Sequence, residues 1–199
     1  MILPIYTYGH AVLKQEAGEI DENYPELGQL VKDMFETLRK SEGVGLAAPQ
    51  VGLPIRLVVV DLDVMSDDMP EFKGYLKSYI NPYIEETDGP MEPYEEGCLS
   101  IPGVDAEIVR PKRIKVRYLD AHLKEVEEEF DDFASRMVQH ELDHLDGVVF
   151  TDRATPIRRK LIAGKLFRLD IDAISGATGT SRAVEDMINE CMTRYGAYI

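Results

Sequence analysis

The chain of 199 residues is 30% charged and 44% hydrophobic, a composition typical of a globular domain and unlike that of disordered or fibrous proteins. Its net charge of −15 argues against DNA or nucleic acid in general as a partner. Two cysteines are too few for a disulfide framework, the opening residues lack the basic region and long apolar run typical of a signal peptide, and no apolar run reaches membrane-spanning length. We therefore expect a cytoplasmic protein that makes no membrane contact.

The first half of the chain contains one predicted helix and two predicted strands. Apolar residues recur at helical spacing over residues 25–41, and Gly43 ends the pattern. Residues 43–50 hold too much glycine for a stable helix and are predicted to form a loop. The β-branched run 55–62 and the similar segment 77–84 are predicted strands.

The second half of the chain is predicted to form a β-hairpin followed by two helices. Residues 113–119 alternate apolar and charged side chains, and residues 124–130 follow after a polar turn, which is typical of an antiparallel hairpin. A helix is expected over residues 131–146, with an aspartate cap and Gly147 as its stop, and another begins at Thr155. Because helices and strands do not alternate regularly, we expect an α+β fold with mixed or antiparallel sheets around a central helix.

The predicted central helix carries the sequence His140-Glu141-Leu142-Asp143-His144. Residues four apart lie on one face of a helix, so the two imidazoles can bind one metal ion. Glu141 beside them can then take a proton from a water that the ion has made more acidic. The alternative is that both histidines merely line a helix face, but a chance H-E-x-x-H is only a roughly 1% event in such a chain. The pattern therefore predicts a metal-dependent hydrolase.

A site of this kind needs a third protein ligand, and two common peptidase patterns do not supply it. The positions where those enzymes carry a histidine or a glutamate are occupied by Phe150 and Gly164. Cys98 is the best remaining candidate, because a thiolate binds such metals tightly, although a lone cysteine is more often a buried thiol. By ligand chemistry, one cysteine and two histidines suit zinc as readily as iron.

Three segments together resemble the signatures of the peptide deformylase family. They are GVGLAAPQ at residues 43–50, EGCLS at 96–100 and HELDHLDG at 140–147, in this order. The resemblance covers approximately residues 1–167. It implies a deformylase-like fold and an enzyme that removes the formyl group from the N-terminal formyl-methionine of newly made proteins and releases formate. N-formylmethionyl nascent peptides would then be its partners.

The resemblance also implies roles for individual residues. Glu141 would accept a proton from the attacking water and deliver it to the departing amine. Gln50 and the backbone N–H of Leu99 would stabilise the oxyanion, and such donors are each typically worth about 3 kcal/mol of barrier. The metal would be iron(II), which nickel, cobalt or zinc readily replace. Its implied ligands are Cys98, His140 and His144.

The same segments suggest how a peptide binds. Glycines allow close approach of another backbone, which suits a substrate docked as an added strand near Val44, Gly45 and Gly97. Met137 and Phe133 lie one and two turns before His140 on the predicted helix and, with Val44, are candidates for the pocket of the methionine side chain. The alternative is that these two residues belong to the ordinary core.

The C-terminal end departs from the family pattern, so we divide the chain into a catalytic domain, 1–168, and a tail, 169–199. Residues 172–181 are similar to the attachment motif of covalent flavin mononucleotide domains, in which Thr178 would carry the flavin. The rest of such a domain, on the order of a hundred residues, has no counterpart here. We therefore expect a glycine-rich turn without flavin, followed by an amphipathic helix after Ser181.

Some assignments stay open from the sequence. Residues 153–168 hold six arginines or lysines and no acid, and can touch ribosomal RNA, although such runs are more often simply solvated. Arg110 can orient a buried acid such as Asp143 or form an exposed ion pair. Two other functions compete with deformylation: a different metallohydrolase with the same ligands, and a binding or flavin-carrying protein.

Overall fold

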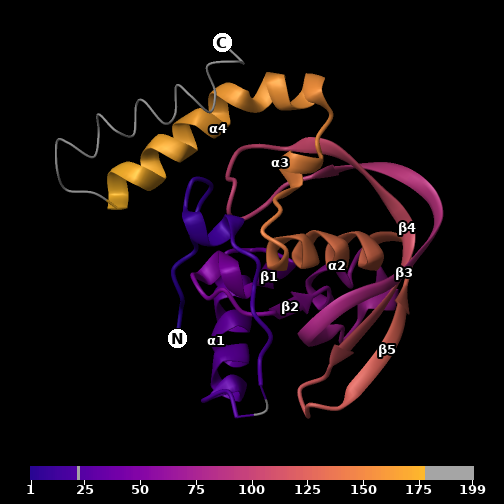
Figure 1. The fold of residues 1–199 in the computed structure, drawn as a ribbon. Coiled ribbons are helices and arrows are strands. Elements are labelled where there is room, and N and C mark those ends of the chain that lie inside the picture. The colour runs from indigo at the N-terminus through magenta and orange to yellow at the C-terminus, as the bar shows by residue number, and fades with distance from the viewer. Residues whose placement is uncertain (22, 178–199) are drawn as a thin grey trace.

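Five strands form one antiparallel sheet in the order β1-β2-β3-β4-β5. The computed structural model describes residues 1–21 and 23–177, and Figure 1 shows the sheet curving around one side of the molecule. The α+β class expected from the sequence is confirmed, and the pairing within the sheet is antiparallel rather than mixed. The strands are β1 (Gly45–Ala47), β2 (Leu57–Asp61), β3 (Leu76–Glu96), β4 (Ala106–Leu119) and β5 (Glu125–Phe130).

One helix, α2, occupies the middle of the fold, as the sequence predicted. In Figure 1 the long strands β3 and β4 bend around α2, while α1 and α4 lie on opposite sides of it. No helix in the described part of the chain is both long and apolar enough to cross a membrane. The α-helices are α1 (Leu27–Lys40), α2 (Asp132–Leu145), α3 (Phe150–Arg153) and α4 (Pro156–Ala177). The short 3-10 helices are η1 (Ala11–Lys14), η2 (Ala48–Val51), η3 (Asp63–Met65) and η4 (Pro70–Phe72).

Helix α2 buries polar side chains as well as apolar ones. Its apolar residues Val138, Leu142 and Leu145 pack into the main core against the sheet. After its last turn, Gly147 adopts a φ of 69°, the left-handed conformation that glycine reaches at the lowest cost. Because buried polar groups are costly unless they are paired, the polar face of α2 must serve a site or a network. The larger polar side chains buried on it are Arg136, Gln139, His140, Glu141, Asp143 and His144.

Residues 43–50 hold more regular structure than the loop predicted for them. Gly45–Ala47 form β1, whose Leu46 pairs with Val59 of β2, and residues 48–51 form the 3-10 helix η2. The loop prediction is wrong here because pairing with a fully buried strand offsets the low strand propensity of glycine. As the first strand of the sheet, β1 leaves one edge of its backbone available to a further strand.

The hairpin region is longer than the sequence indicated. The strand predicted at 77–84 continues to residue 96, and the one predicted at 113–119 begins at residue 106. Residues 84–95 are almost all exposed, so they lack the alternation that reveals a strand in a sequence. Backbone pairing with β4 holds them instead, with register shifts on the way. The predicted hairpin of β4 and β5 is confirmed.

Helix α4 passes the boundary that we placed at residue 168. It begins as predicted, with the Thr155 hydroxyl accepting a hydrogen bond from the backbone N of Arg158 at 3.3 Å, and runs to Ala177. Residues 172–177, predicted as part of a turn, are therefore helical. Asp170 and Ala173 are buried close to the backbone of Gly9, and this packing outweighs the local glycine and serine content. Thr178 and the helix predicted after Ser181 lie outside the described residues.

Candidate metal centre

Three side chains with metal-binding atoms meet between the end of β3 and helix α2. Cys98 follows β3, and His140 and His144 lie on successive turns of α2. Their ligand atoms all lie within 4.8 Å of one another, and Cys98 Sγ is 3.2 Å from His144 Nε2. Both imidazoles are buried. One thiolate and two imidazoles form a donor set that zinc and related transition ions accept, and three protein ligands leave a position for reactants.

Each histidine can present Nε2 to the metal. His140 Nδ1 lies 2.9 Å from Glu96 Oε2, so its other nitrogen is left for a cation. Burial alone lowers the pKa of His140, but hydrogen bonds to Cys98 and Glu96 raise it to about 10. Burial holds the pKa of His144 well below its usual value, which keeps that ring neutral. Binding of a metal ion would therefore release a proton from His140.

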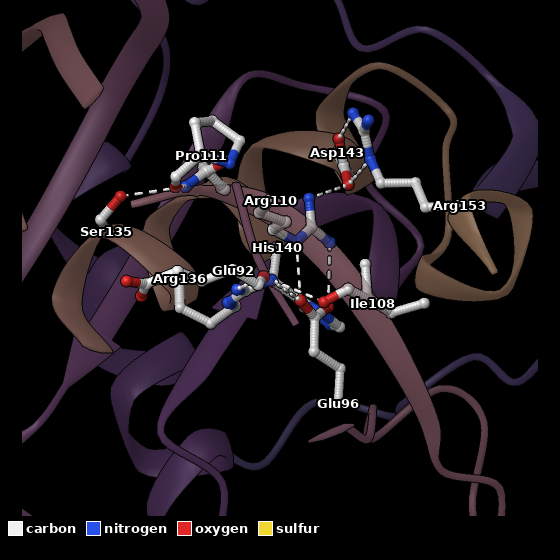
Figure 2. Close-up of polar contacts among 11 residues, drawn as sticks. Glu92, Glu96, Ile108, Arg110, Pro111, Ser135, Arg136, His140, Asp143 and Arg153 are labelled. Carbon is white, nitrogen blue, oxygen red and sulfur yellow. Dashed lines mark hydrogen bonds and ion pairs between the residues drawn. The ribbon is translucent and has the colours of Figure 1, made fainter. Parts of the chain in front are cut away.

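Glu96 is held from several sides, as Figure 2 shows. Arg110 donates from Nε to Oε1 at 2.7 Å and from Nη2 to Oε2 at 2.9 Å, and Arg136 Nη1 donates to Oε1 at 3.0 Å. Burial alone would raise the pKa of Glu96, but the hydrogen bonds from Arg110 and His140 lower it well below its usual range. Glu96 is thus an ionised, fixed acceptor for His140.

The position of Arg110 answers a question that the sequence left open. Its side chain is buried, and Nη1 donates to Asp143 Oδ2 at 2.7 Å, so the buried ion pair is confirmed rather than the exposed one. Burial alone would lower the pKa of Arg110, but Glu96 and Asp143 raise it above its ordinary value. Arg110 therefore links the acid beside His140 to a second acid on α2.

Glu141 lies next to the metal ligands and against β1. Its carboxyl is buried, and Oε2 has no hydrogen-bond partner among the described residues. Burial raises its pKa to about 7. A Cβ added to Gly45 would lie 2.5 Å from Glu141 Oε1, so only glycine leaves room for the carboxyl at this position of β1. Glu141 thus has the burial and the pKa that suit a group exchanging protons near neutral pH.

The orientation of the Gln50 amide is fixed by its neighbours. Its Oε1 accepts from the backbone N of Ala47 at 2.8 Å, so Nε2 must face the other way. There Nε2 lies 3.2 Å from Ser100 Oγ and 3.5 Å from Cys98 Sγ. The amide therefore directs N–H groups toward the candidate metal site, and Leu99 borders the same space.

A cavity of about 330 Å³ opens beside these groups. Of the residues predicted to bind substrate, Val44, Gly45, Gly97 and Met137 line it. Phe133 lines a second cavity of about 250 Å³ instead, together with Tyr94 and Arg136. The cavity at the metal site is lined by Glu42, Gly43, Val44, Gly45, Gln50, Gly97, Cys98, Leu99, Pro102, Met137, His140 and Glu141.

Comparisons with known proteins agree with this geometry. A family model described as polypeptide deformylase matches residues 2–160. The chain belongs to the polypeptide deformylase family. A peptide deformylase of Cytophaga hutchinsonii is 46% identical over 176 residues, which are 87% of this chain and 95% of that protein. One of Salinibacter ruber is 46% identical over 166 residues, 81% of this chain and 85% of that protein.

Solved deformylase structures share the fold. A peptide deformylase from Thermotoga maritima matches with a TM-score of 0.71 at 40% identity, covering 78% of this chain and 99% of that one. An Arabidopsis thaliana peptide deformylase matches with a TM-score of 0.78 at 33% identity, covering 90% and 95%. The resemblance seen in three short segments is confirmed. The chain is a metal-dependent hydrolase that removes the N-formyl group from nascent peptides.

Three residues of the site were not singled out from the sequence: Glu96, Arg136 and Ser100. Glu96 and Ser100 belong to the segment 96–100 that carried the deformylase resemblance, but their partners come from distant elements. Arg136 gave a usable signal, because it lies four residues before His140 and therefore on the same face of α2. A charged residue on the face of a helix that holds two metal ligands is a candidate for a supporting role.

Replacing Gly45 tests the contact between β1 and the carboxyl of Glu141. In Gly45→Ala the new methyl group would lie 2.5 Å from Glu141 Oε1, closer than van der Waals contact, and push the carboxyl aside. Displacement of a reacting group by about 1 Å can cost roughly 100-fold in rate, and we expect a loss of formate release of that order. The metal content should stay at the parental level, because no metal ligand moves.

Gly164→Ala is the matched control for this substitution. A Cβ at Gly164 in α4 meets nothing within 4 Å. It should leave deformylation unchanged and raise stability by about 0.5–1 kcal/mol, the usual gain when alanine replaces glycine inside a helix. A Gly45→Ala enzyme with parental activity would show that the Glu141 carboxyl does not need this position.

Replacing Glu96 tests the support of His140. Glu96→Gln keeps the shape but removes the charge that Arg110 and Arg136 hold in place. Partners of this kind are typically worth about 10- to 100-fold in metal affinity, and we expect a loss in that range in a competition assay with a chelator. Glu85→Gln is the control, since Glu85 forms an ion pair with Arg117 in which both side chains are 40% exposed. Equal affinity in both variants would contradict the role of Glu96.

Proposed function

We propose that Cys98, His140 and His144 bind the catalytic metal and that this metal is iron(II). The support is the meeting of the three ligand atoms beside a cavity, together with the acid that orients His140. The ligand chemistry also accepts zinc, nickel or cobalt, so the choice of iron rests on the family resemblance. When bound, the ion supplies a Lewis acid that polarises the formyl group and lowers the pKa of water.

Glu141 is proposed to move the proton during hydrolysis. Its buried carboxyl, with a pKa near 7, can accept a proton from the attacking water and deliver it to the nitrogen of the departing amine. The C–N bond of the formamide breaks, and formate and the free amino terminus are the products. Glu141 returns to its starting state, so one side chain serves first as base and then as acid.

Gln50 and the backbone N–H of Leu99 are proposed to stabilise the negative oxygen of the tetrahedral intermediate. The support is that the amide of Gln50 is held in one orientation, with Nε2 toward Ser100 and Cys98. A fixed donor is effective because it needs no rearrangement when charge develops. Leu99 follows Cys98 in the chain and lines the same cavity, which supports the proposed role of its backbone N–H as the second donor.

The substrate is proposed to lie along the open edge of β1. Val44 and Gly45 on one side and Gly97 on the other would flank the peptide backbone, which then adds a strand to the sheet. Met137 and Val44 would contact the side chain of the first methionine. Phe133 lies one helical turn before Met137 and borders the second cavity, so we place it at the outer end of the methionine pocket.

Formate release from formyl-methionyl peptides tests the function directly. Protein purified without oxygen and loaded with iron(II) or nickel should release one formate for each free amino terminus formed. A different metallohydrolase would cleave internal peptide bonds and release no formate. Metal analysis of the same preparation before loading identifies the native ion, and zinc at one equivalent with full activity would overturn the choice of iron.

Cytoplasmic location and brief contact with the ribosome remain parts of this proposal. They fit an enzyme that acts on nascent peptides. On α4, the side chains of Arg158, Lys160, Lys165 and Arg168 are exposed, which makes a basic surface available. We expect co-sedimentation with ribosomes to weaken steeply with added salt if this surface makes the contact.

A further inference from the structure

Arg153, at the end of helix α3, donates hydrogen bonds to Asp143, a buried carboxylate on α2. Its Nε donates to Asp143 Oδ2 at 2.6 Å, and its Nη2 contacts Oδ1, so the two groups meet through two parallel hydrogen bonds (Figure 2). The side chain of Arg153 is 47% exposed, whereas that of Asp143 is 7% exposed. An arginine at the surface thus compensates much of the charge of an acid inside the protein.

The second partner of Asp143 is Arg110, which donates hydrogen bonds to two acids. Arg110 gives one N–H to Asp143 and two to Glu96, and Glu96 in turn holds His140. A continuous chain of ionic hydrogen bonds therefore runs from the surface to a metal ligand. Because Arg153 supplies two donors to Asp143, Arg110 can keep two of its own on Glu96.

We propose that Arg153 is a positioning residue for the metal centre, which holds Arg110 on Glu96 and thereby fixes the ring of His140. Without Arg153, the described contacts leave Asp143 only the single N–H of Arg110. A buried carboxylate with one donor is costly, so Arg110 would turn toward Asp143 and give up a hydrogen bond to Glu96. Glu96 would then keep Arg136 and one hydrogen bond of Arg110, and this weaker hold would fix the ring of His140 less firmly. This inference rests on the proposed function, because it takes His140 as a metal ligand.

The competing explanation is that Arg153 only fastens α3 to α2. That role would change the stability of the fold without changing how a folded molecule holds its metal. The two explanations therefore differ in a property of the native state, the rate at which a bound ion leaves. They also differ in the light absorption of bound cobalt(II), which responds to the orientation of its ligands.

The experiment uses the full chain loaded with cobalt(II) without oxygen. The rate of cobalt transfer to a chelator and the cobalt absorption spectrum are compared for the parent, Arg153→Met and Arg153→Lys. We expect Arg153→Met to lose cobalt about 3- to 10-fold faster, less than the 10- to 100-fold typical of a direct partner of a ligand, with a shifted spectrum. Arg153→Lys should recover part of the difference, because an ammonium restores the charge but not the paired geometry.

Arg117→Met is the matched control, because Arg117 is also half-exposed and pairs with Glu85 away from the metal ligands. A coupled test repeats Arg153→Met in the Glu96→Gln background, where the chain to His140 is already broken and no further acceleration should appear. Parental release and spectrum in Arg153→Met, or the same acceleration in both backgrounds, would overturn the inference. A parent that binds no cobalt would instead refute the proposed metal site and, with it, the role of Arg153.

Discussion

Glu141→Ala should bind metal at the parental stoichiometry and yet release formate about 10²- to 10⁴-fold more slowly, the usual contribution of a positioned acid or base. The metal stays because its proposed ligands, Cys98, His140 and His144, are all unchanged in this variant. The rate falls because no other described carboxyl lines the metal-site cavity from a buried position. Metal analysis and a formate assay on the same sample separate the two effects.

The stability of this variant provides the control against misfolding. Glu141 buries a carboxyl whose Oε2 lacks a partner among the described residues, and such a group costs folding free energy. Glu141→Gln keeps the volume and removes the charge, so we expect a melting temperature at least equal to that of the parent, with the same loss of rate. Substantial activity in either variant would mean that Glu141 is not the proton carrier.

The sequence predicted those parts of the site in which spacing alone brings residues together. His140 and His144 were placed on one helix face by a spacing of four, and Glu141 followed from the same motif. Spacing could not place Cys98 and Gln50 near α2. Cys98 reaches α2 because β3 leads to it, and Gln50 does so because it lies in η2, which follows β1. Ligand chemistry made Cys98 the best candidate for the third ligand, whereas only the resemblance to a family brought Gln50 into the prediction.

The elements that were missed share a physical cause. The extension of β3 over residues 84–95 carries no burial pattern, since backbone pairing with β4 holds it. The strand at Gly45–Ala47 was hidden by Gly43 and Gly45, of which Gly45 is required by the close approach of Glu141. The helical course of residues 172–177 depends on packing of Ala173 and Asp170 near Gly9, which is distant in the sequence. In each case a long-range contact outweighed the local preference.

The support of His140 could be anticipated only in part. Arg110 and Asp143 were considered as a pair, and the structure adds Glu96 as the acid between Arg110 and His140. In the β3–β4 ladder Arg110 lies opposite Glu92 and Glu96 lies opposite Ala106, so Arg110 meets an acid four positions along β3 from its own cross-strand partner. A sequence does not reveal that an arginine reaches this more distant acid rather than the one directly opposite.

Cys98→Ala should fail to retain metal under conditions in which the parent keeps one equivalent. Loss of a direct ligand should exceed the 10- to 100-fold cost of losing an outer partner, so we expect affinity to fall by more than about 100-fold. Cys191→Ala is the matched control, because it removes the other cysteine of the chain, which is not among the proposed ligands. Competition with a chelator followed by metal analysis gives both affinities.

The cysteine variant also tests the network around the ligands. With the thiolate gone, His140 loses one of the two hydrogen bonds that raise its pKa, while Glu96, Arg110 and Asp143 keep their contacts with each other. The fold should therefore persist, with a circular dichroism spectrum like that of the parent. Cys98→Ser offers an oxygen that binds these ions more weakly than a thiolate and should fall between the two. If Cys98→Ala kept its metal at parental affinity, the third ligand would have to be another residue at the cavity, and Glu141 would be the first to examine.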